Sequence, residues 1–264
     1  SRGLGDVYKR QLEKLIKTKK TNEFSFKIEG EIKSNLKDNE YLEMVKKGIK
    51  HCFRGDVFQI VLSRKFSQKF SGDEFCVYRQ LRSINPSPYL FYFDYGNFKI
   101  FGSSPEAQLV IKDEKAEIHP IAGTFKRTGN DLIDSKKAKK LFQDEKENSE
   151  HMMLVDLARN DLSRSCNNVK VEKDREIQFY SHVIHLVSKV TGKLKSISKN
   201  IIGNTFPAGT LTGAPKHKAM NLIEKYEKNN RSFYGGAIGF IDFENNYNHA
   251  IIIRSVSYTH LRAH

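Results

Sequence analysis

Residues 144–161 form the feature that most constrains the fold, an uninterrupted stretch that reads DEKENSEHMMLVDLARND. The stretch contains neither glycine nor proline, so we expect it to form a helix. One face of this helix, at helical spacing, carries Glu147, Glu150, His151, Leu154 and Ala158. Clustered carboxylates beside an apolar seam cost free energy unless a cation compensates them, and Mg²⁺ commonly takes one or two protein carboxylates. The alternative is a solvated acidic turn paired with Lys146.

The chain carries a formal charge of +14, from 45 Lys and Arg against 31 Asp and Glu. Such a charge raises the question of nucleic-acid binding. However, the lysines are scattered, and no zinc-finger, helix-turn-helix or RNP pattern is present. We therefore favour a lysine-rich surface and expect no nucleic-acid partner, while a basic nucleic-acid-binding protein stays the alternative from another class. A basic cleft for a dianionic substrate would add to the same charge.

The three cysteines, Cys52, Cys76 and Cys166, stand apart without a C-x-x-C pair. This spacing favours a reducing cytoplasm and argues against a disulfide framework or a zinc site. No apolar run approaches the length of a membrane span, and no signal peptide is visible, so we expect a cytoplasmic protein without a membrane partner.

Composition divides the 264 residues into four segments. Residues 1–11 and 256–264 resemble translated adapter sequence, and we expect both to be non-native flanks. Residues 12–37 are polar and lysine-rich and are predicted to be a linker. Residues 38–255 are predicted to form one domain, which is long enough to bury a substantial core.

Apolar periodicity and turn residues predict alternating helices and strands in this domain. Helices are expected at 38–55, 73–84 and after residue 216. The first helix is predicted to carry its apolar face on Leu42, Val45, Ile49 and Phe53. Strands are expected at 57–66, 89–95, 98–102, 117–121, 167–171, 177–191 and 250–255. The mixture predicts an α+β fold.

Short motifs surround the central stretch. They read NPSPYL at 85–90, SSPE at 103–106, PIAGT at 120–124, FPAGTLTGAPK at 206–216 and YGGAIG at 234–239. Gly123 and Thr124 can present backbone N–H groups and a hydroxyl to a carboxylate. The segment 206–216, followed by a predicted helix, is typical of an anion-binding loop. By itself, a histidine such as His185 in a half-buried strand is more often a core residue than a catalyst.

Together with residues 144–161, these motifs resemble the signatures of the chorismate-utilising enzymes, and most of all the anthranilate synthase component I branch. The resemblance covers about residues 53–255. It implies an α+β fold with a large antiparallel β-sandwich-like core, helices outside and an active site between the sheets. It also implies the reaction of chorismate and ammonia to anthranilate and pyruvate, a step of tryptophan biosynthesis.

The resemblance assigns roles to individual residues. Glu106 matches the general acid for the departing hydroxyl, which needs a pKa raised towards neutrality. His185 matches a catalytic residue near the substrate ring. The positions that contact substrate match Gly123, Thr124, Thr210, Tyr234 and Arg254. Mg²⁺ is the implied cofactor, with Glu150 as a ligand and Glu147 beside it holding metal-bound water.

Two positions bear on the product. Gln59 stands where isochorismate and salicylate synthases place a basic lysine, and Ala122 stands where aminodeoxychorismate synthases place a nucleophilic lysine. Neither an amide nor a methyl group can replace an amine. Anthranilate is therefore the expected product. Aminodeoxychorismate synthase is the alternative enzyme, and an isochorismate or salicylate synthase is less favoured.

The resemblance also implies partners. Ammonia would come from a separate glutamine amidotransferase subunit, since the chain contains no G-x-C-x-G nucleophile motif. Pro88, Tyr89 and Leu90 match part of the tryptophan feedback site of the family. The family continues past the strand at 250–255 into a segment with the second Mg²⁺ ligand, so we expect these 264 residues alone to be inactive.

Overall fold

The computed structural model describes residues 13–14, 17, 25–180, 182–196 and 200–259. Its helices are α2 (Asp38–Phe53), α3 (Glu74–Ile84), α4 (Asp131–Gln143), α5 (Glu145–Ser163), α6 (Asn200–Thr205), α7 (Gly209–Thr212) and α8 (Lys216–Tyr226). Its strands are β1 (Phe26–Ser34), β2 (Gln59–Ile60), β3 (Phe66–Gly72), β4 (Tyr89–Asp94), β5 (Phe98–Ser104), β6 (Ala107–Lys112), β7 (Lys115–Ile118), β8 (Ile121–Lys126), β9 (Cys166–Phe179), β10 (Val183–Leu194), β11 (Gly213–Ala214), β12 (Ala237–Ile241), β13 (Tyr247–Ile251) and β14 (Ser255–Thr259). The predicted flank at 1–11 lies outside the described residues.

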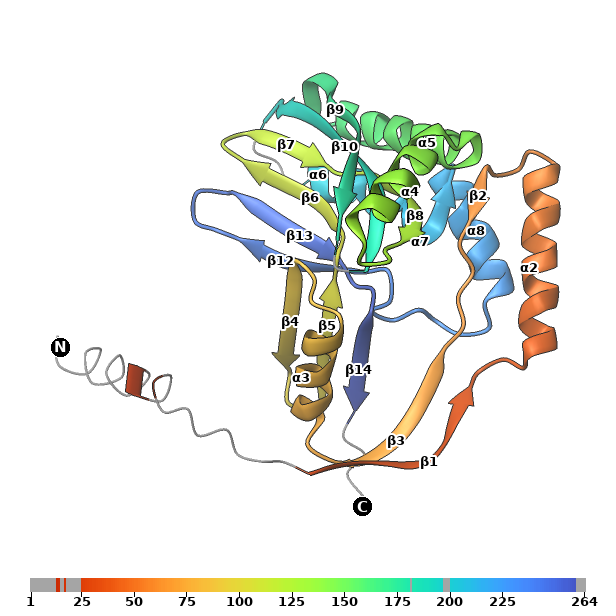
Figure 1. The fold of residues 1–264 in the computed structure, drawn as a ribbon, viewed down its shortest axis with the longest axis vertical. Coiled ribbons are helices and arrows are strands. Elements are labelled where there is room, and N and C mark those ends of the chain that lie inside the picture. Colours follow the sequence, from red (N-terminus) through yellow and green to blue (C-terminus); the bar gives the residue numbers. More distant parts are fainter. Residues whose placement is uncertain (1–12, 15–16, 18–24, 181, 197–199, 260–264) are drawn as a thin grey trace.

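Antiparallel pairing joins the described strands into sheets. A seven-stranded sheet has the order β12-β13-β6-β7-β10-β8, with β9 also paired to β10. A three-stranded sheet has the order β14-β5-β4, and β1–β3 and β11–β2 form two small sheets. In Figure 1 the three-stranded sheet lies below the seven-stranded one, and α5 runs along the top of the view. This arrangement confirms the predicted α+β fold with a large antiparallel sheet.

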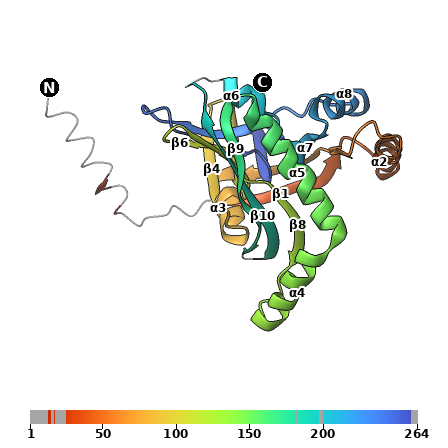
Figure 2. The same cartoon turned by 90° about the horizontal axis from the view of Figure 1, so that it is seen from above.

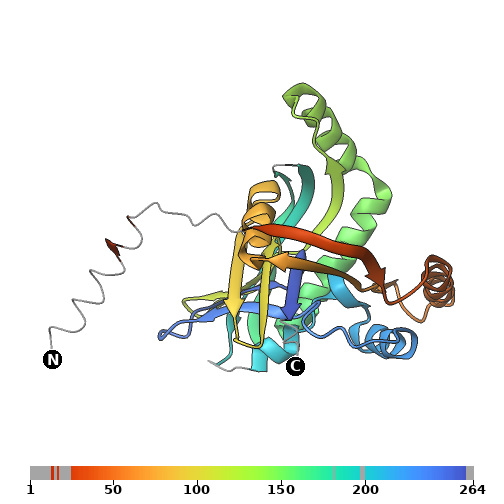
Figure 3. The ribbon, with the colours of Figure 1, turned by 90° about the horizontal axis from the view of Figure 1, so that it is seen from below.

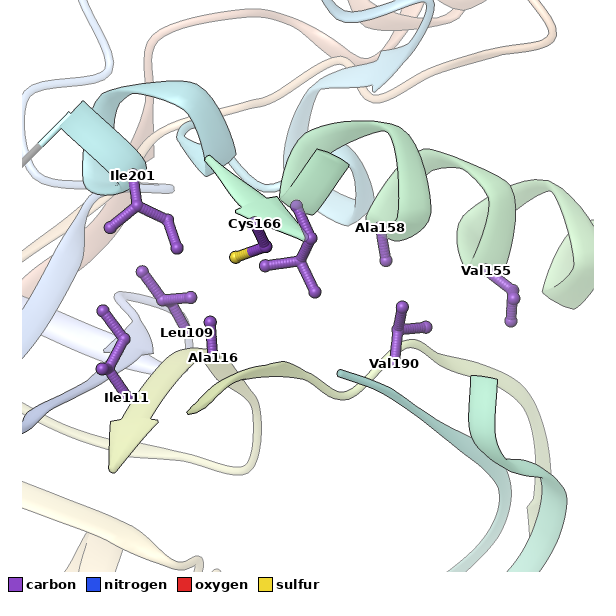
Figure 4. Close-up of a cluster of buried hydrophobic side chains, with 9 residues drawn as sticks. Leu109, Ile111, Ala116, Val155, Ala158, Cys166, Val190 and Ile201 are labelled. Carbon is purple, nitrogen blue, oxygen red and sulfur yellow. The ribbon is translucent and has the colours of Figure 1, made fainter. Parts of the chain in front are cut away.

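The main core lies between α5 and the seven-stranded sheet (Figure 4). It contains Leu109, Ile111, Ala116, Val155, Ala158, Leu162, Cys166, Val190 and Ile201. Helix α5 begins after Asp144, whose side chain accepts a hydrogen bond from Glu147 N at 3.1 Å. Leu162 is fully buried, which contributes on the order of 2 kcal/mol. The helix predicted over 144–161 is confirmed, and Figure 2 shows α4 projecting beyond its N-terminal end.

Helix α2 buries a different face from the predicted one. Leu42, Ile49 and Phe53 are all exposed, Phe53 to 88%. The buried residues of the helix are instead Met44, Gly48 and His51. At Gly48 the helix packs so closely that an added Cβ would stand 3.1 Å from the Leu62 side chain. The predicted face is therefore wrong, apart from half-buried Val45. Side chains of Leu62 and Ile60 pack against Gly48, and hydropathy does not report such a contact at a glycine.

Two predicted strands differ in extent from those observed. Within the strand predicted at 57–66, Gln59–Ile60 form β2, which pairs with β11, and the last residue, Phe66, already belongs to β3. The strand predicted at 177–191 is divided by a turn, in which Tyr180 N donates to Val183 O at 2.9 Å. This turn contains neither glycine nor proline, so the sequence offered no local signal for it.

Strands near both ends of the chain pair in sheets. The segment predicted as a linker at 12–37 includes β1, which pairs with β3. Figure 3 shows this pair of strands leading towards α2. The segment predicted as a C-terminal flank contributes most of β14, which pairs with β5. No described helix combines the length and the apolar character needed to cross a membrane.

Candidate active site

Glu106 lies where the chain passes from the three-stranded sheet to the seven-stranded one. Strand β5 ends at Ser104 and β6 begins at Ala107. The Glu106 carbonyl oxygen accepts a hydrogen bond from Ile251 N at 3.0 Å. On the side chain, Thr210 Oγ1 donates to Glu106 Oε1 at 2.9 Å. Backbone pairing and a hydroxyl from a distant loop therefore both hold Glu106.

The Glu106 carboxyl is set to exchange a proton near neutral pH. Burial raises its pKa to about 7, while the hydrogen bond from Thr210 and the positive charge of Arg254 act in the opposite direction. The carboxyl can therefore carry a proton at neutral pH. This is the ionisation that the predicted general acid requires.

Arg254 occupies the second crossing between the same two sheets, because it lies between β13 and β14. Its φ of 50° places it in the left-handed region, which is uncommon for a residue other than glycine. Its charge acts on the carboxyl of Glu106 and on the imidazole of His185, and its Nη1 donates to Asn85 Oδ1 at 3.5 Å. The positive charge of Arg254 therefore affects both predicted catalytic groups.

His185 lies on β10 and pairs with Thr124 of β8. Its Nδ1 lies 3.0 Å from the carbonyl oxygen of Gly123 and 3.1 Å from Thr124 Oγ1. A carbonyl oxygen can only accept, so the bond to Gly123 places the proton on Nδ1 and leaves Nε2 as the acceptor. Burial lowers the pKa of His185, which favours this neutral form. Gly123 forms an irregularity in the ladder, and its φ of 72° suits glycine.

Thr210 and Tyr234 come from the C-terminal third of the chain. Thr210 lies in α7, within the loop 206–216. Burial raises the pKa of Tyr234, whose ring lies 5.5 Å from the Arg231 guanidinium. The next residue, Gly235, donates from its backbone N to Ile252 O at 3.1 Å. Tyr234 is therefore held beside the segment that leads to Arg254, although no direct contact between the two side chains is seen in the described part of the chain.

Glu147 and Glu150 are half-buried on one face of α5. A Cβ added to Gly123 would stand 3.4 Å from Glu147 Oε2, so the Glu147 carboxylate lies against the irregularity of β8 at Gly123. Gln59 Nε2 donates to Glu150 Oε1 at 3.5 Å. Among the described residues, no group of three or more His, Cys, Asp or Glu side chains could hold a metal ion. Two carboxylates nevertheless fit Mg²⁺, which takes its remaining ligands from water and substrate oxygens.

The remaining predicted positions are placed as follows. Ala122 is buried and pairs with Leu186 of β10. Pro88 precedes β4, where Tyr89 and Leu90 pair with residues 104 and 103 of β5. The Tyr89 hydroxyl donates to Asn248 Oδ1 at 3.0 Å. Tyr89 and Leu90 thus pair with the residues that precede Glu106 by two and three positions. They belong to a different sheet from His185.

Two clusters around the site were missed by sequence reasoning. Arg231 Nη1 donates to Leu211 O at 2.7 Å and its Nη2 to Val61 O at 2.6 Å, while Glu227 accepts from Arg231. These bonds join the Thr210 loop to the segment that follows β2. The second cluster surrounds Lys216, which ends the motif FPAGTLTGAPK and was given no role. Charged residues that bond backbone carbonyls leave no spacing pattern in the sequence, so only their place beside a motif could have drawn attention.

A sequence profile described as chorismate binding enzyme matches residues 4–264. The chain belongs to this family. Component 1 of the anthranilate synthase of Aquifex aeolicus (strain VF5) is 44% identical over 230 residues, which are 86% of this chain and 47% of that protein. Component 1 from Saccharolobus solfataricus is 45% identical over 84% of this chain and 53% of that protein. The resemblance is confirmed, and the chain spans about half the length of these curated relatives.

Solved structures give the same relation. Anthranilate synthase component I from Streptococcus pneumoniae TIGR4 superposes with a TM-score of 0.86 at 34% identity, over 97% of this chain and 58% of that one. A putative 2,3-dihydroxybenzoate-specific isochorismate synthase from Bacillus anthracis gives a TM-score of 0.76 at 25% identity, over 91% and 66%. The fold is therefore shared by family members with different reactions, and the choice among those reactions depends on the site.

Proposed function

We propose that this chain carries the chorismate-converting site of an anthranilate synthase component I, which turns chorismate and ammonia into anthranilate, pyruvate and water. The observation that carries the proposal is Glu106, a carboxyl with a pKa of about 7 that Thr210 holds at the junction of the two sheets. The similarity to proteins named anthranilate synthase component 1 supports this reaction over others in the family.

In this mechanism Glu106 acts in its protonated form and gives its proton to the ring hydroxyl, which departs as water while ammonia adds to the ring. The enolpyruvyl group then leaves as pyruvate, and the ring becomes aromatic. Arg254 binds a substrate carboxylate, since a guanidinium offers paired donors to two carboxylate oxygens. His185 keeps its Nδ1 proton on the Gly123 carbonyl and offers Nε2 as an acceptor near the ring. Thr124, exposed on the same strand, offers a hydroxyl to the substrate.

Mg²⁺ is the proposed cofactor, with Glu150 as a ligand and Glu147 beside it holding metal-bound water. Their place on one face of α5, against Gln59 and Gly123, supports this assignment. When bound, the ion would hold the ring carboxylate of chorismate and withdraw electron density from the ring. The negative charge of the two glutamates would be compensated at the same time.

The proposed product is anthranilate because positions 59 and 122 lack the lysine amines that other branches of the family place there. Gln59, which contacts Glu150, cannot deliver hydroxide as a lysine would, and buried Ala122 cannot form a covalent adduct. A full-length version given chorismate, Mg²⁺ and ammonium should yield anthranilate as its main product by chromatography. Isochorismate or 4-amino-4-deoxychorismate as the main product would refute the assignment. Gln59→Lys should raise isochorismate relative to anthranilate.

We further propose that a glutamine amidotransferase subunit supplies the ammonia and that the protein is cytoplasmic.

We also propose that tryptophan acts as a feedback inhibitor at a site that includes Pro88, Tyr89 and Leu90. The pairing of residues 89–90 with 103–104 supports a feedback role, because it offers a short path to Glu106. Tryptophan should lower turnover in a full-length version, and Leu90→Ser should weaken that inhibition.

The test of the reaction is the pair Glu106→Gln and Glu224→Gln in a full-length version. Glu224 is exposed on α8 and outside the site, so its variant serves as the matched control. Glu106→Gln should lower the rate of anthranilate formation by about 10²–10⁴-fold, since a general acid typically contributes that much. Equal rates for the two variants, at equal folded fractions, would remove Glu106 from the mechanism.

A further inference from the structure

The carbonyl oxygen of Thr205 receives two side-chain donors from different parts of the fold. Lys216 Nζ donates to it at 2.7 Å, and Gln108 Nε2 donates to it at 3.0 Å. Thr205 is the last residue of α6 and Lys216 is the first of α8. Their bond therefore closes the base of the loop 206–215, and this loop carries Thr210.

Each donor is anchored outside the loop. Lys216 Nζ forms an ion pair with Asp161 Oδ2 of α5 at 2.6 Å, and both side chains are nearly buried, at 13% and 10% exposure. The Gln108 amide is oriented by His249, whose Nε2 lies 3.0 Å from Gln108 Oε1. An amide oxygen only accepts, so His249 donates from Nε2, and its Nδ1 then accepts from the Tyr247 hydroxyl.

These contacts tie together the two partners of the hydrogen bond in the site. Gln108 lies two residues after Glu106, near the start of β6, and Lys216 closes the loop that presents Thr210. A shift of the loop base relative to β6 would move Thr210 Oγ1 away from Glu106 Oε1. Buried charge-assisted hydrogen bonds of this kind resist such shifts, because a buried charge or carbonyl without a hydrogen-bond partner costs free energy.

We propose that Lys216 is a positioning residue. Its hydrogen bond to the Thr205 carbonyl, together with its ion pair with Asp161, forms what we call the clasp, and the clasp holds Thr210 against the Glu106 carboxylate. The proposal rests on the proposed function in one respect, which is the role of Glu106 as the general acid. An alternative role for Lys216 is direct binding of an anionic substrate. Its ammonium, however, already contacts Asp161 and Thr205 and is largely shielded from solvent.

The clasp is testable on the 264-residue chain without substrate, by the carboxyl titration of Glu106. NMR on protein labelled with ¹³C at glutamate carboxyls reports each pKa, and Glu106→Gln identifies the resonance. A hydrogen bond to a carboxylate lowers its pKa, so Thr210→Val should raise the pKa of Glu106. Lys216→Met should raise it as well, and adding Lys216→Met to Thr210→Val should raise it no further, because one residue acts through the other.

The control is Lys99→Met, which breaks another partly buried pair, with Glu74, away from the site. It should leave the pKa of Glu106 unchanged. If Lys216→Met does not fold, Lys216→Met/Asp161→Leu removes both charges together and should give the same rise. An unchanged pKa of Glu106 in the folded variant, or full additivity with Thr210→Val, would overturn the clasp. Anthranilate formation from chorismate by a full-length version tests the proposed function separately.

Discussion

The two ends of helix α5 lie in opposite surroundings. Its C-terminal half carries Leu154, Val155, Ala158 and Leu162, which are buried against the seven-stranded sheet. Its N-terminal half carries Glu147 and Glu150, half-buried beside residues of the candidate site. Helix α5 thus contributes hydrophobic stability at its C-terminal end and positions charged side chains beside the candidate site at its N-terminal end. Substitutions at the two ends should therefore separate in their effects on unfolding and on turnover.

The largest loss of stability is expected at the buried end, for Leu162→Ala. The variant leaves a cavity where a side chain is fully buried, which typically costs about 2–5 kcal/mol. Urea denaturation of the 264-residue chain measures it. Met152→Ala on the exposed side of the same helix is the control and should cost much less. A loss below about 1 kcal/mol at Leu162 would mean that this end of α5 is not the stabilising one.

An intermediate loss is expected at the boundary of the helix, for Asp144→Ala. The Asp144 side chain caps α5 by accepting from Glu147 N, and losing such a cap costs about 1 kcal/mol. Asp144→Asn keeps an acceptor oxygen and should retain most of the stability. The same denaturation experiment decides, and a drop of equal size in both variants would show that the charge, and not the cap, is what matters.

The smallest loss of stability is expected at the site end, for Glu150→Ala. The free energy of unfolding should change by no more than about 0.5 kcal/mol, since within the described part of the chain the side-chain hydrogen bond of Glu150 is a long one, 3.5 Å from Gln59 Nε2. In a full-length version, however, the same change should abolish Mg²⁺-dependent turnover. Glu145→Ala, exposed one turn earlier, should leave both properties unchanged. Full turnover of Glu150→Ala at ordinary Mg²⁺ concentrations would remove Glu150 as a ligand.

The same contrast explains what the sequence could predict of the fold. Helix α5 was predictable because its burial follows the apolar stripe of its C-terminal half. Helix α2 was predictable as a helix but not in its buried face, because Gly48 lets another segment approach. The turn between β9 and β10 lacks glycine and proline and therefore escaped detection.

For the candidate site, the sequence indicated candidate residues but not their contacts. Glu106, Thr210, Arg254 and His185 come from separate segments. Glu106 and Arg254 lie at the two crossings between the sheets, Thr210 bonds Glu106, and the charge of Arg254 acts on both Glu106 and His185. The hydrogen bond between Thr210 and Glu106 could not be read from the sequence, since 104 positions separate the two residues. Such pairs depend on how β6 and the loop 206–216 are packed, which is a tertiary property.

The central claim is that Glu106 acts as the proton donor, and the pH dependence of turnover tests it most directly. The ratio kcat/KM for chorismate, which reports ionisations of the free enzyme, is measured in a full-length version from about pH 6 to about pH 9, with the concentration of uncharged ammonia held constant. Because the protonated carboxyl is the active form, kcat/KM should be highest at low pH and should fall as pH rises through about 7. A kcat/KM that stays constant across this range would contradict the account.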